Sequence, residues 1–132
     1  METKHLLIVD DSKMVRKIIA ISLKDEKQFT LHEAGSGLEA LDKLMEIEAP
    51  VDLIFTDINM PNMDGLELIR RCQEDEKYQG IPIIVITTED GAKDRQRALE
   101  LGAVGFVSKP LDRASIVDIT LSTLKKYARR DS

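Results

Sequence analysis

The sequence has one cysteine, no tryptophan, three phenylalanines and two tyrosines. A single cysteine, Cys72, cannot form a disulfide within the chain, so the fold must rest on a buried core rather than on covalent cross-links. No apolar run approaches the roughly 20 residues that a membrane helix requires, and the first residues lack the apolar core of a signal peptide. We therefore expect a cytoplasmic protein with no membrane partner, in which Cys72 is a helical thiol without a role of its own.

The chain also has no excess of basic residues. The chain has 24 acidic and 19 basic residues, a net charge of −5, which argues against nucleic-acid binding. Its 132 residues suffice for one domain with a core of its own. Only residues 128–132 follow the last predicted helix, so we expect a single domain over residues 1–132 and no output domain. We also expect a monomer.

Short apolar runs alternate with amphipathic segments along the whole chain. The runs predict strands, and each is followed by a predicted helix, the last two helices lying over 92–101 and 112–127. Continuous rather than alternating hydrophobicity is typical of strands in a buried parallel sheet. The pattern therefore predicts an α/β fold, a parallel sheet of five strands with helices on both faces. The predicted strands are 6–9, 29–34, 53–55, 81–86 and 104–107.

The apolar residues of the predicted helices recur at helical spacing and predict their buried faces. In chain order these are Met14, Val15, Ile18, Ile19 and Ile21; Leu38, Leu41 and Met45; Leu66, Ile69 and Cys72; and Ile116, Ile119 and Leu124 with Val117 and Leu121 beside them. The helix over 92–101 has few large apolar residues. Because helices gain most of their stability from packing, we expect it to be the least anchored.

Reactive side chains follow four of the five strands. Asp10 and Asp11 follow the first, Asp57 the third, Thr87 the fourth and Lys109 the fifth. The carboxyl ends of parallel strands share one edge of a sheet, so these side chains should converge. Carboxylates about 4 Å apart repel by roughly 4 kcal/mol per pair at an effective dielectric near 20, so three of them require protonation or a cation. With no histidine or cysteine at these strand ends, the ligands are hard oxygens, which favours Mg²⁺.

With Mg²⁺ bound, each of these residues has a predicted role. Asp57 is the nucleophile, because a carboxylate can form an aspartyl phosphate. Asp11 binds the metal directly and Asp10 binds it through water, while Lys109 neutralises phosphoryl oxygens and Thr87 donates a hydrogen bond to one. Taken singly, each is an ordinary turn or capping residue, and the prediction rests on their conjunction. The two histidines, His5 and His32, have no such company and are interpreted as ordinary residues.

Five motifs carry a resemblance to a known family. They are VDDS at 9–12, TDINMP at 56–61, DG at 64–65, IT at 86–87 and VSKP at 107–110. Together they resemble the receiver domain of bacterial two-component response regulators, most closely the stand-alone CheY-like type. The resemblance implies a flavodoxin-like (βα)5 three-layer sandwich with strand order 2-1-3-4-5, a histidine kinase as phosphodonor, and a cis peptide before Pro110. It also implies Mg²⁺ held by Asp11, Asp57 and the backbone carbonyl of Asn59, and a signalling domain that catalyses only its own phosphorylation and dephosphorylation.

The same resemblance implies a switch. Thr87 shifts toward the phosphoryl group and Phe106 rotates inward behind it, while Asn59 and Glu89 tune the lifetime of the phosphoryl group. Two residues depart from the family: many relatives have tyrosine at the position of Phe106, and alanine or glycine at that of Thr88. The implied output face for a downstream effector comprises the helix over 92–101, the fifth strand and the last helix. On it, Lys93, Arg95 and Arg97 form either a partner surface or a solvated charged face.

Several functions remain open. A stand-alone receiver can serve chemotaxis, which the combination of Asn59, Glu89 and Lys109 favours, or pass phosphate to a histidine phosphotransfer protein in a phosphorelay. Phosphatases of the haloacid-dehalogenase type also use an aspartate nucleophile and Mg²⁺, but they carry a second aspartate two residues later, where this chain has Asn59. Their nucleophile follows the first strand, whereas Asp57 follows the third. An interaction module that needs no phosphorylation is disfavoured because every matching site residue is intact.

Overall fold

A computed structural model describes residues 3–26, 28–60, 63–88 and 91–127 of the chain. Five parallel strands form one sheet in the order β2-β1-β3-β4-β5. This confirms the predicted α/β class and the strand order 2-1-3-4-5. The strands are β1 (Lys4–Val9), β2 (Phe29–Ala34), β3 (Val51–Asp57), β4 (Ile83–Thr87) and β5 (Gly105–Ser108).

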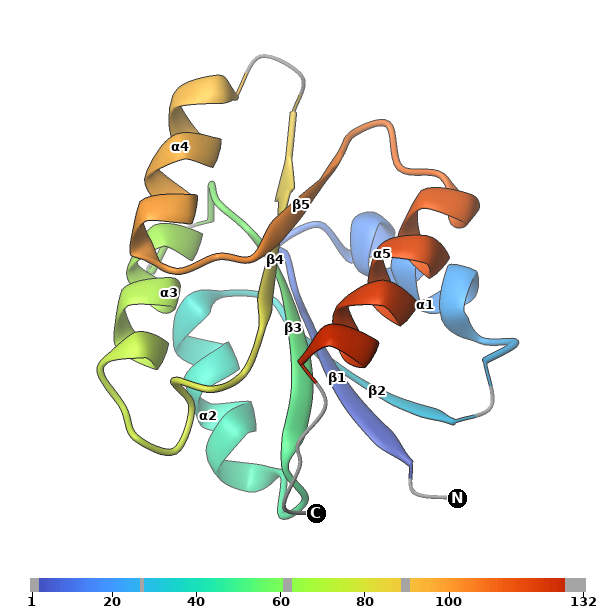
Figure 1. Cartoon of the computed structure of the whole chain (residues 1–132), viewed down its shortest axis with the longest axis horizontal. Helices are drawn as coiled ribbons and strands as arrows, with labels where there is room; N and C mark the ends of the chain where they lie inside the picture. The colour runs from blue at the N-terminus through green and yellow to red at the C-terminus, as the bar shows by residue number, and fades with distance from the viewer. Residues whose placement is uncertain (1–2, 27, 61–62, 89–90, 128–132) are drawn as a thin grey trace.

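Helices cover both faces of the sheet, as predicted (Figure 1). On one face α1 and α5 pack against β-strand residues such as Ile8 and Phe55. On the other, α2, α3 and α4 pack against residues such as Leu7 and Ile54. Successive strand residues therefore enter different cores, which is why these strands are apolar throughout. The helices are α1 (Lys13–Leu23), α2 (Gly37–Glu46), α3 (Gly65–Gln73), α4 (Ala92–Leu101) and α5 (Arg113–Lys126).

Four of these helices begin at a side-chain cap, in which an oxygen of the capping residue accepts a backbone N–H of the first turn. The caps are Ser12, Ser36, Asp64 and Asp112. Helix α4 differs, because it begins after Gly91, which supplies no side-chain cap. Ala98 is its single buried residue, which confirms that α4 is weakly anchored.

The predicted buried face of α1 is wrong in its breadth. Ile19 and Leu23 are buried, but Met14 is 72% exposed, and Ile18 and Ile21 are exposed as well. Helix α1 lies between the sheet and solvent with α5 beside it, so a narrow strip of it reaches the core. The apolar residues on its other sides stay in water.

The predicted apolar stripe of α2 is wrong for two of its three residues. Leu41 packs against the core, but Leu38 and Met45 are exposed, whereas Ala40 and Leu44 are buried. In α5 the predicted residues Ile116, Val117, Ile119 and Leu124 lie in or against the core, but Leu121 is exposed and Thr120 is buried. The hydroxyl of Thr120 donates to the Ile116 carbonyl at 2.6 Å, so its burial leaves no unmet hydrogen bond.

Candidate functional site

The carboxyl ends of the two central strands bring three carboxylates together. Strands β1 and β3 are neighbours with Val9 opposite Thr56, so the residues that follow, Asp10 and Asp57, lie side by side. Both are buried, while Asp11 is exposed at the mouth of the site. One oxygen from each carboxylate lies within 4.8 Å of the other two. The convergence predicted from the strand ends is therefore present in the fold.

Asp10 is held from several directions. Its backbone N–H donates to the Ala34 carbonyl at 3.1 Å, and its Oδ1 accepts the Ser12 backbone N–H at 2.8 Å. The Arg16 guanidinium donates to the Asp10 carbonyl oxygen and also pairs with Glu33 at 2.9 Å. The other carboxylate oxygen, Oδ2, is buried and accepts no hydrogen bond from any described residue. A buried charged oxygen without a donor is costly, which indicates a place for a cation.

Asp57 is fixed by the turn that follows β3. Its Oδ1 accepts the Ile58 backbone N–H at 2.8 Å, and Gly65 donates its N–H to the Ile58 carbonyl at 2.8 Å. A Cβ atom at Gly65 would overlap the Asp57 carbonyl oxygen. Glycine is thus required where α3 begins, because the helix passes directly against the end of the strand.

Burial raises the pKa of both buried carboxyl groups. For Asp10 the loss of solvent raises the pKa to about 6, with a further rise from the Asp57 charge, against the lowering effects of the Ser12 N–H and Lys109. Burial likewise raises the pKa of Asp57, and the Lys109 ammonium and the backbone N–H groups of Ile58 and Asn59 oppose that rise. The site is therefore a strained cluster of acids that a cation would relieve.

The hydroxyl and the ammonium come from the next two strands. Thr87 ends β4 and is buried, and its hydroxyl donates to the Thr88 carbonyl at 3.2 Å rather than to Asp57. Lys109 follows β5, and its backbone N–H donates to the Thr87 carbonyl at 2.8 Å. The Lys109–Pro110 bond is cis, as the resemblance implied. Four strand ends thus meet at one edge, with Lys109 close enough for its charge to act on Asp10 and Asp57.

These residues fit Mg²⁺. One oxygen from each of three carboxylates lies within 4.8 Å of the other two, and Asp10 carries the orphaned oxygen. Mg²⁺ is bound in proteins by one or two carboxylates, with water and phosphate oxygens completing the octahedron. The exposed position of Asp11 leaves room for such additional ligands.

Other predicted residues lie around this cluster. Asn59 is exposed two residues beyond Asp57, and Thr88 is exposed beside Thr87. Phe106 is 40% exposed on β5, so it is not a plain core aromatic. Glu89 lies outside the described residues, and its predicted role stays a prediction. Sequence reasoning missed the contact of Arg16 with the Asp10 carbonyl, for which helix spacing offers no signal.

Comparison with known proteins identifies the fold and the family. Residues 6–120 match the family model of the response regulator receiver domain. The chain belongs to this family. A receiver domain is a signalling domain of response regulators, and the resemblance noted from the motifs is thereby confirmed. The phosphatase alternative gains no support, since Asp57 ends β3 rather than following the first strand.

Several proteins that are similar to this chain are named as chemotaxis proteins. It is 41% identical over 105 residues to the chemotaxis protein CheY homolog of Campylobacter jejuni, covering 80% of each chain. It is 40% identical over 105 residues to chemotaxis protein CheY1 of Helicobacter pylori, covering 80% of this chain and 84% of that protein. The solved structure of CheY4 of Vibrio cholerae superimposes with a TM-score of 0.82 at 30% identity, over 92% of this chain and 98% of that one.

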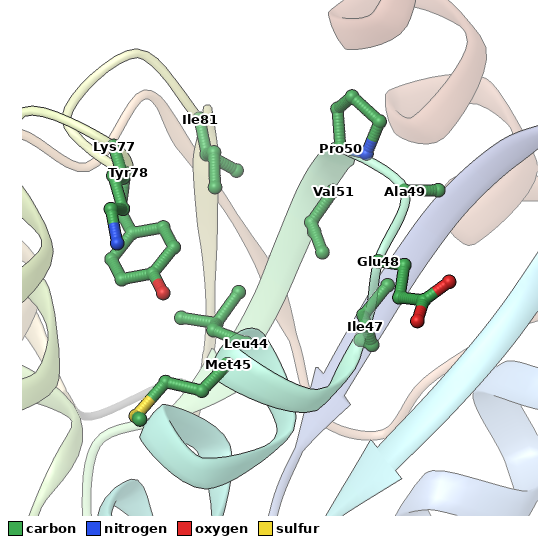
Figure 2. Close-up of a pocket in the computed structure, with 10 residues that line it drawn as sticks. All are labelled: Leu44, Met45, Ile47, Glu48, Ala49, Pro50, Val51, Lys77, Tyr78 and Ile81. Carbon is green, nitrogen blue, oxygen red and sulfur yellow. The ribbon is translucent and has the colours of Figure 1, made fainter.

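Two further features lie away from the acidic cluster. A pocket of about 550 Å³ lies near the amino ends of β3 and β4, opposite the acidic cluster. Figure 2 shows the Tyr78 ring near Leu44 and the Glu48 carboxylate turned away from the pocket. The two histidines are partly buried and lie outside the acidic cluster, as predicted, and His5 Nδ1 and His32 Nε2 are 3.0 Å apart across β1 and β2. None of the helices in the described part of the chain is long and apolar enough to span a membrane.

Proposed function

We propose that this receiver domain accepts a phosphoryl group on Asp57 from a histidine kinase in a Mg²⁺-dependent reaction. The observation that carries the proposal is the approach of three carboxylates to within 4.8 Å, with an orphaned oxygen on Asp10. Such a cluster is stable only when a cation is present or a proton is held. Asp11, Asp57 and the Asn59 carbonyl would hold the ion, and Asp10 would hold it through water.

Asp57 is the nucleophile. Its Oδ1 is engaged by the Ile58 N–H, which leaves the other carboxylate oxygen to attack. A bond forms between that oxygen and phosphorus while the bond from phosphorus to the donor nitrogen breaks, and the nitrogen keeps the electron pair. Bound Mg²⁺ neutralises charge on the phosphoryl oxygens. Lys109 adds a second positive charge at the same oxygens.

The same atoms connect phosphorylation to the output. The Thr87 hydroxyl turns from the Thr88 carbonyl to a phosphoryl oxygen, and Phe106 rotates inward behind it. A downstream effector then binds the face made by α4, β5 and α5. Asn59 and Glu89 set how long the phosphoryl group survives. The domain acts catalytically only on its own phosphorylation and dephosphorylation.

The relatives support a chemotaxis pathway for this chain, since two of the most similar are named chemotaxis proteins. In that role the chain works as a cytoplasmic monomer, a single receiver domain over residues 1–132 whose effector is a protein. A phosphorelay would use the same site, with a histidine phosphotransfer protein as the acceptor. Purified transfer partners of each kind distinguish the two pathways.

The proposal is tested by incubating the protein with a small phosphodonor and Mg²⁺ and measuring its mass. We expect one acid-stable, alkali-labile phosphoryl group per chain, formed only with Mg²⁺ and absent from Asp57→Asn. Asp64→Asn is the matched control, because asparagine caps helices as well as aspartate does and Asp64 lies on the surface. Absence of an adduct from the wild type contradicts the proposal, as does catalytic turnover of a phosphate ester.

A further inference from the structure

Arg95 contacts the Phe106 ring and the Thr88 carbonyl, which also accepts the Thr87 hydroxyl. Its guanidinium carbon lies 5.2 Å from the centroid of the Phe106 ring, within the roughly 6 Å range of a cation–π interaction. Its Nη1 also donates to the Thr88 carbonyl at 3.4 Å. Arg95 is on α4, Phe106 is on β5, and Thr88 follows β4. The Arg95 side chain therefore links α4, β5 and the residue that follows β4. Helix α4 and strand β5 belong to the face that is expected to change with phosphorylation.

The Thr88 carbonyl is a shared acceptor. Besides Arg95 it accepts the Thr87 hydroxyl at 3.2 Å and the Gly91 N–H at 3.1 Å. A carbonyl oxygen has two lone pairs, so three donors at one oxygen compete. The hydroxyl that must turn toward the phosphoryl group and the guanidinium that covers Phe106 are thus coupled through one atom.

The outward orientation of the Phe106 ring depends on a group that packs over it. Phe106 is a large apolar side chain on an edge strand, and 40% of its surface is exposed. Exposure of an aromatic ring is unfavourable, so the outward orientation is stabilised by what lies over the ring. In the described structure that group is the Arg95 guanidinium.

We propose that Arg95 is a positioning residue that holds Phe106 outward and thereby opposes the active arrangement. The inference deepens the proposed function and rests on it, since Thr87 and Phe106 are the switch residues there. Cation–π pairs at exposed sites shift an equilibrium by about twofold to fivefold. Arg95 therefore sets the resting ratio of outward to inward Phe106 without touching the reacting atoms.

The test on the ring uses unphosphorylated protein labelled with fluorophenylalanine and observed by ¹⁹F NMR. The chain has three phenylalanines, so Phe106 is assigned by its loss in Phe106→Leu. Arg95→Gln is expected to move the Phe106 signal toward a less solvent-exposed position, with about a twofold to fivefold rise in the inward population. Arg97→Gln removes an exposed cation from the same helix and should leave the signal unchanged. Arg95→Lys keeps a cation and should restore part of the wild-type ratio.

The second measurement is the initial rate of phosphorylation by a small phosphodonor. Arg95→Gln should be faster than wild type by about twofold to fivefold, and Arg97→Gln should match wild type. An unchanged Phe106 signal in Arg95→Gln overturns the inference, as does a changed signal with an unchanged rate. Because the ring is measured without phosphate, failure of the inference is distinct from failure of the proposed function, in which the wild type forms no adduct at all.

Discussion

The two halves of the sheet are built differently. Around β1 and β3 the acids Asp10 and Asp57 are buried, one carboxylate oxygen of each accepts a backbone N–H, and the adjoining helices α1 and α3 carry side-chain caps. Around β4 and β5 the fourth helix lacks a side-chain cap and buries one residue, and Phe106 on the edge strand is exposed. One half is fixed in place and the other is loosely attached.

This difference fits the division of labour in the proposed mechanism. A phosphoryl-accepting carboxylate must be held in one geometry, whereas a read-out surface must have two arrangements of similar free energy. Moving an equilibrium from 1:99 to 99:1 requires about 5.5 kcal/mol. A weakly packed α4 lowers the free energy that phosphorylation has to supply, because few buried contacts are exchanged.

The largest predicted effect lies in the fixed half. Gly65→Ala places a methyl group onto the Asp57 carbonyl, and neither backbone segment can move without disturbing β3. We expect a loss of about 3 kcal/mol or more in the free energy of unfolding, measured by urea denaturation. Gly80→Ala is the matched control, since nothing lies within 4 Å of its Cβ position. Equal stability of the two variants would show that this half is less rigid than described.

The second prediction concerns the acids themselves. Asp10→Asn removes a buried charge from beside two others, so without Mg²⁺ the variant should be more stable than wild type by up to about 3 kcal/mol at pH 7. That figure is the free-energy equivalent of a pKa raised from 3.8 to about 6. Asp42→Asn, an exposed site on α2, should change little. A destabilised Asp10→Asn variant contradicts the picture of a cluster strained by its own charge.

The pH dependence of this effect has a definite sign. An acid whose pKa is raised by folding binds its proton more tightly in the native state, so its favourable contribution is complete below pH 3.8 and disappears as pH rises through about 6. Wild-type stability without Mg²⁺ should therefore fall over this range, and it should fall less in Asp10→Asn. The remaining decrease comes from Asp57, whose pKa is raised in the same direction. Mg²⁺ should reverse the loss in wild type, by about 2.7 kcal/mol at 100 times its dissociation constant, and should stabilise Asp10→Asn less at the same concentration.

The convergence of side chains at the strand ends could be predicted from the sequence. Strand carboxyl ends share an edge by topology, so Asp10, Asp57 and Thr87 had to meet once the strands were recognised. That inference required no knowledge of how a helix is rotated about its own axis.

The predictions that were wrong concern which side of a helix is buried, and this depends on how the helix is rotated about its axis. Helices α1, α2 and α5 carry apolar residues on more than one side, so periodicity alone did not choose the buried strip. In α2 the small side chain of Ala40 is buried and the larger Met45 is exposed. In α5 Thr120 is buried, and its hydroxyl donates a hydrogen bond. The contact of Arg95 with Phe106 depends on where α4 lies against β5, which no local pattern specifies.

A third, smaller effect compares α3 with α4. Asp64→Ala removes the cap that accepts the Glu67 N–H at 2.9 Å, and should cost about 1 kcal/mol. Amide hydrogen exchange in the first turn of α3 should then rise by about fivefold, toward the rate of the uncapped α4. Glu74→Gln on the same helix removes only an exposed ion pair with Arg70 and should cost less than about 0.5 kcal/mol. If α4 exchanges as slowly as α3 in wild type, the proposed difference between the halves is wrong.

The smallest change in stability is expected at Gly91, at the start of α4. A Cβ atom there would lie 2.6 Å from the Thr87 hydroxyl oxygen, and Thr87 can relieve the contact by rotating its side chain. Gly91→Ala should therefore cost about 1 kcal/mol or less in unfolding free energy. It should slow phosphorylation by a small phosphodonor severalfold, because the displaced hydroxyl must return before it can reach a phosphoryl oxygen. Gly65→Ala disturbs folding first, whereas Gly91→Ala should disturb signalling while the fold survives. A Gly91→Ala protein with wild-type kinetics would mean that the Thr87 hydroxyl takes no part in the transfer, and that the loosely attached half only reads the result.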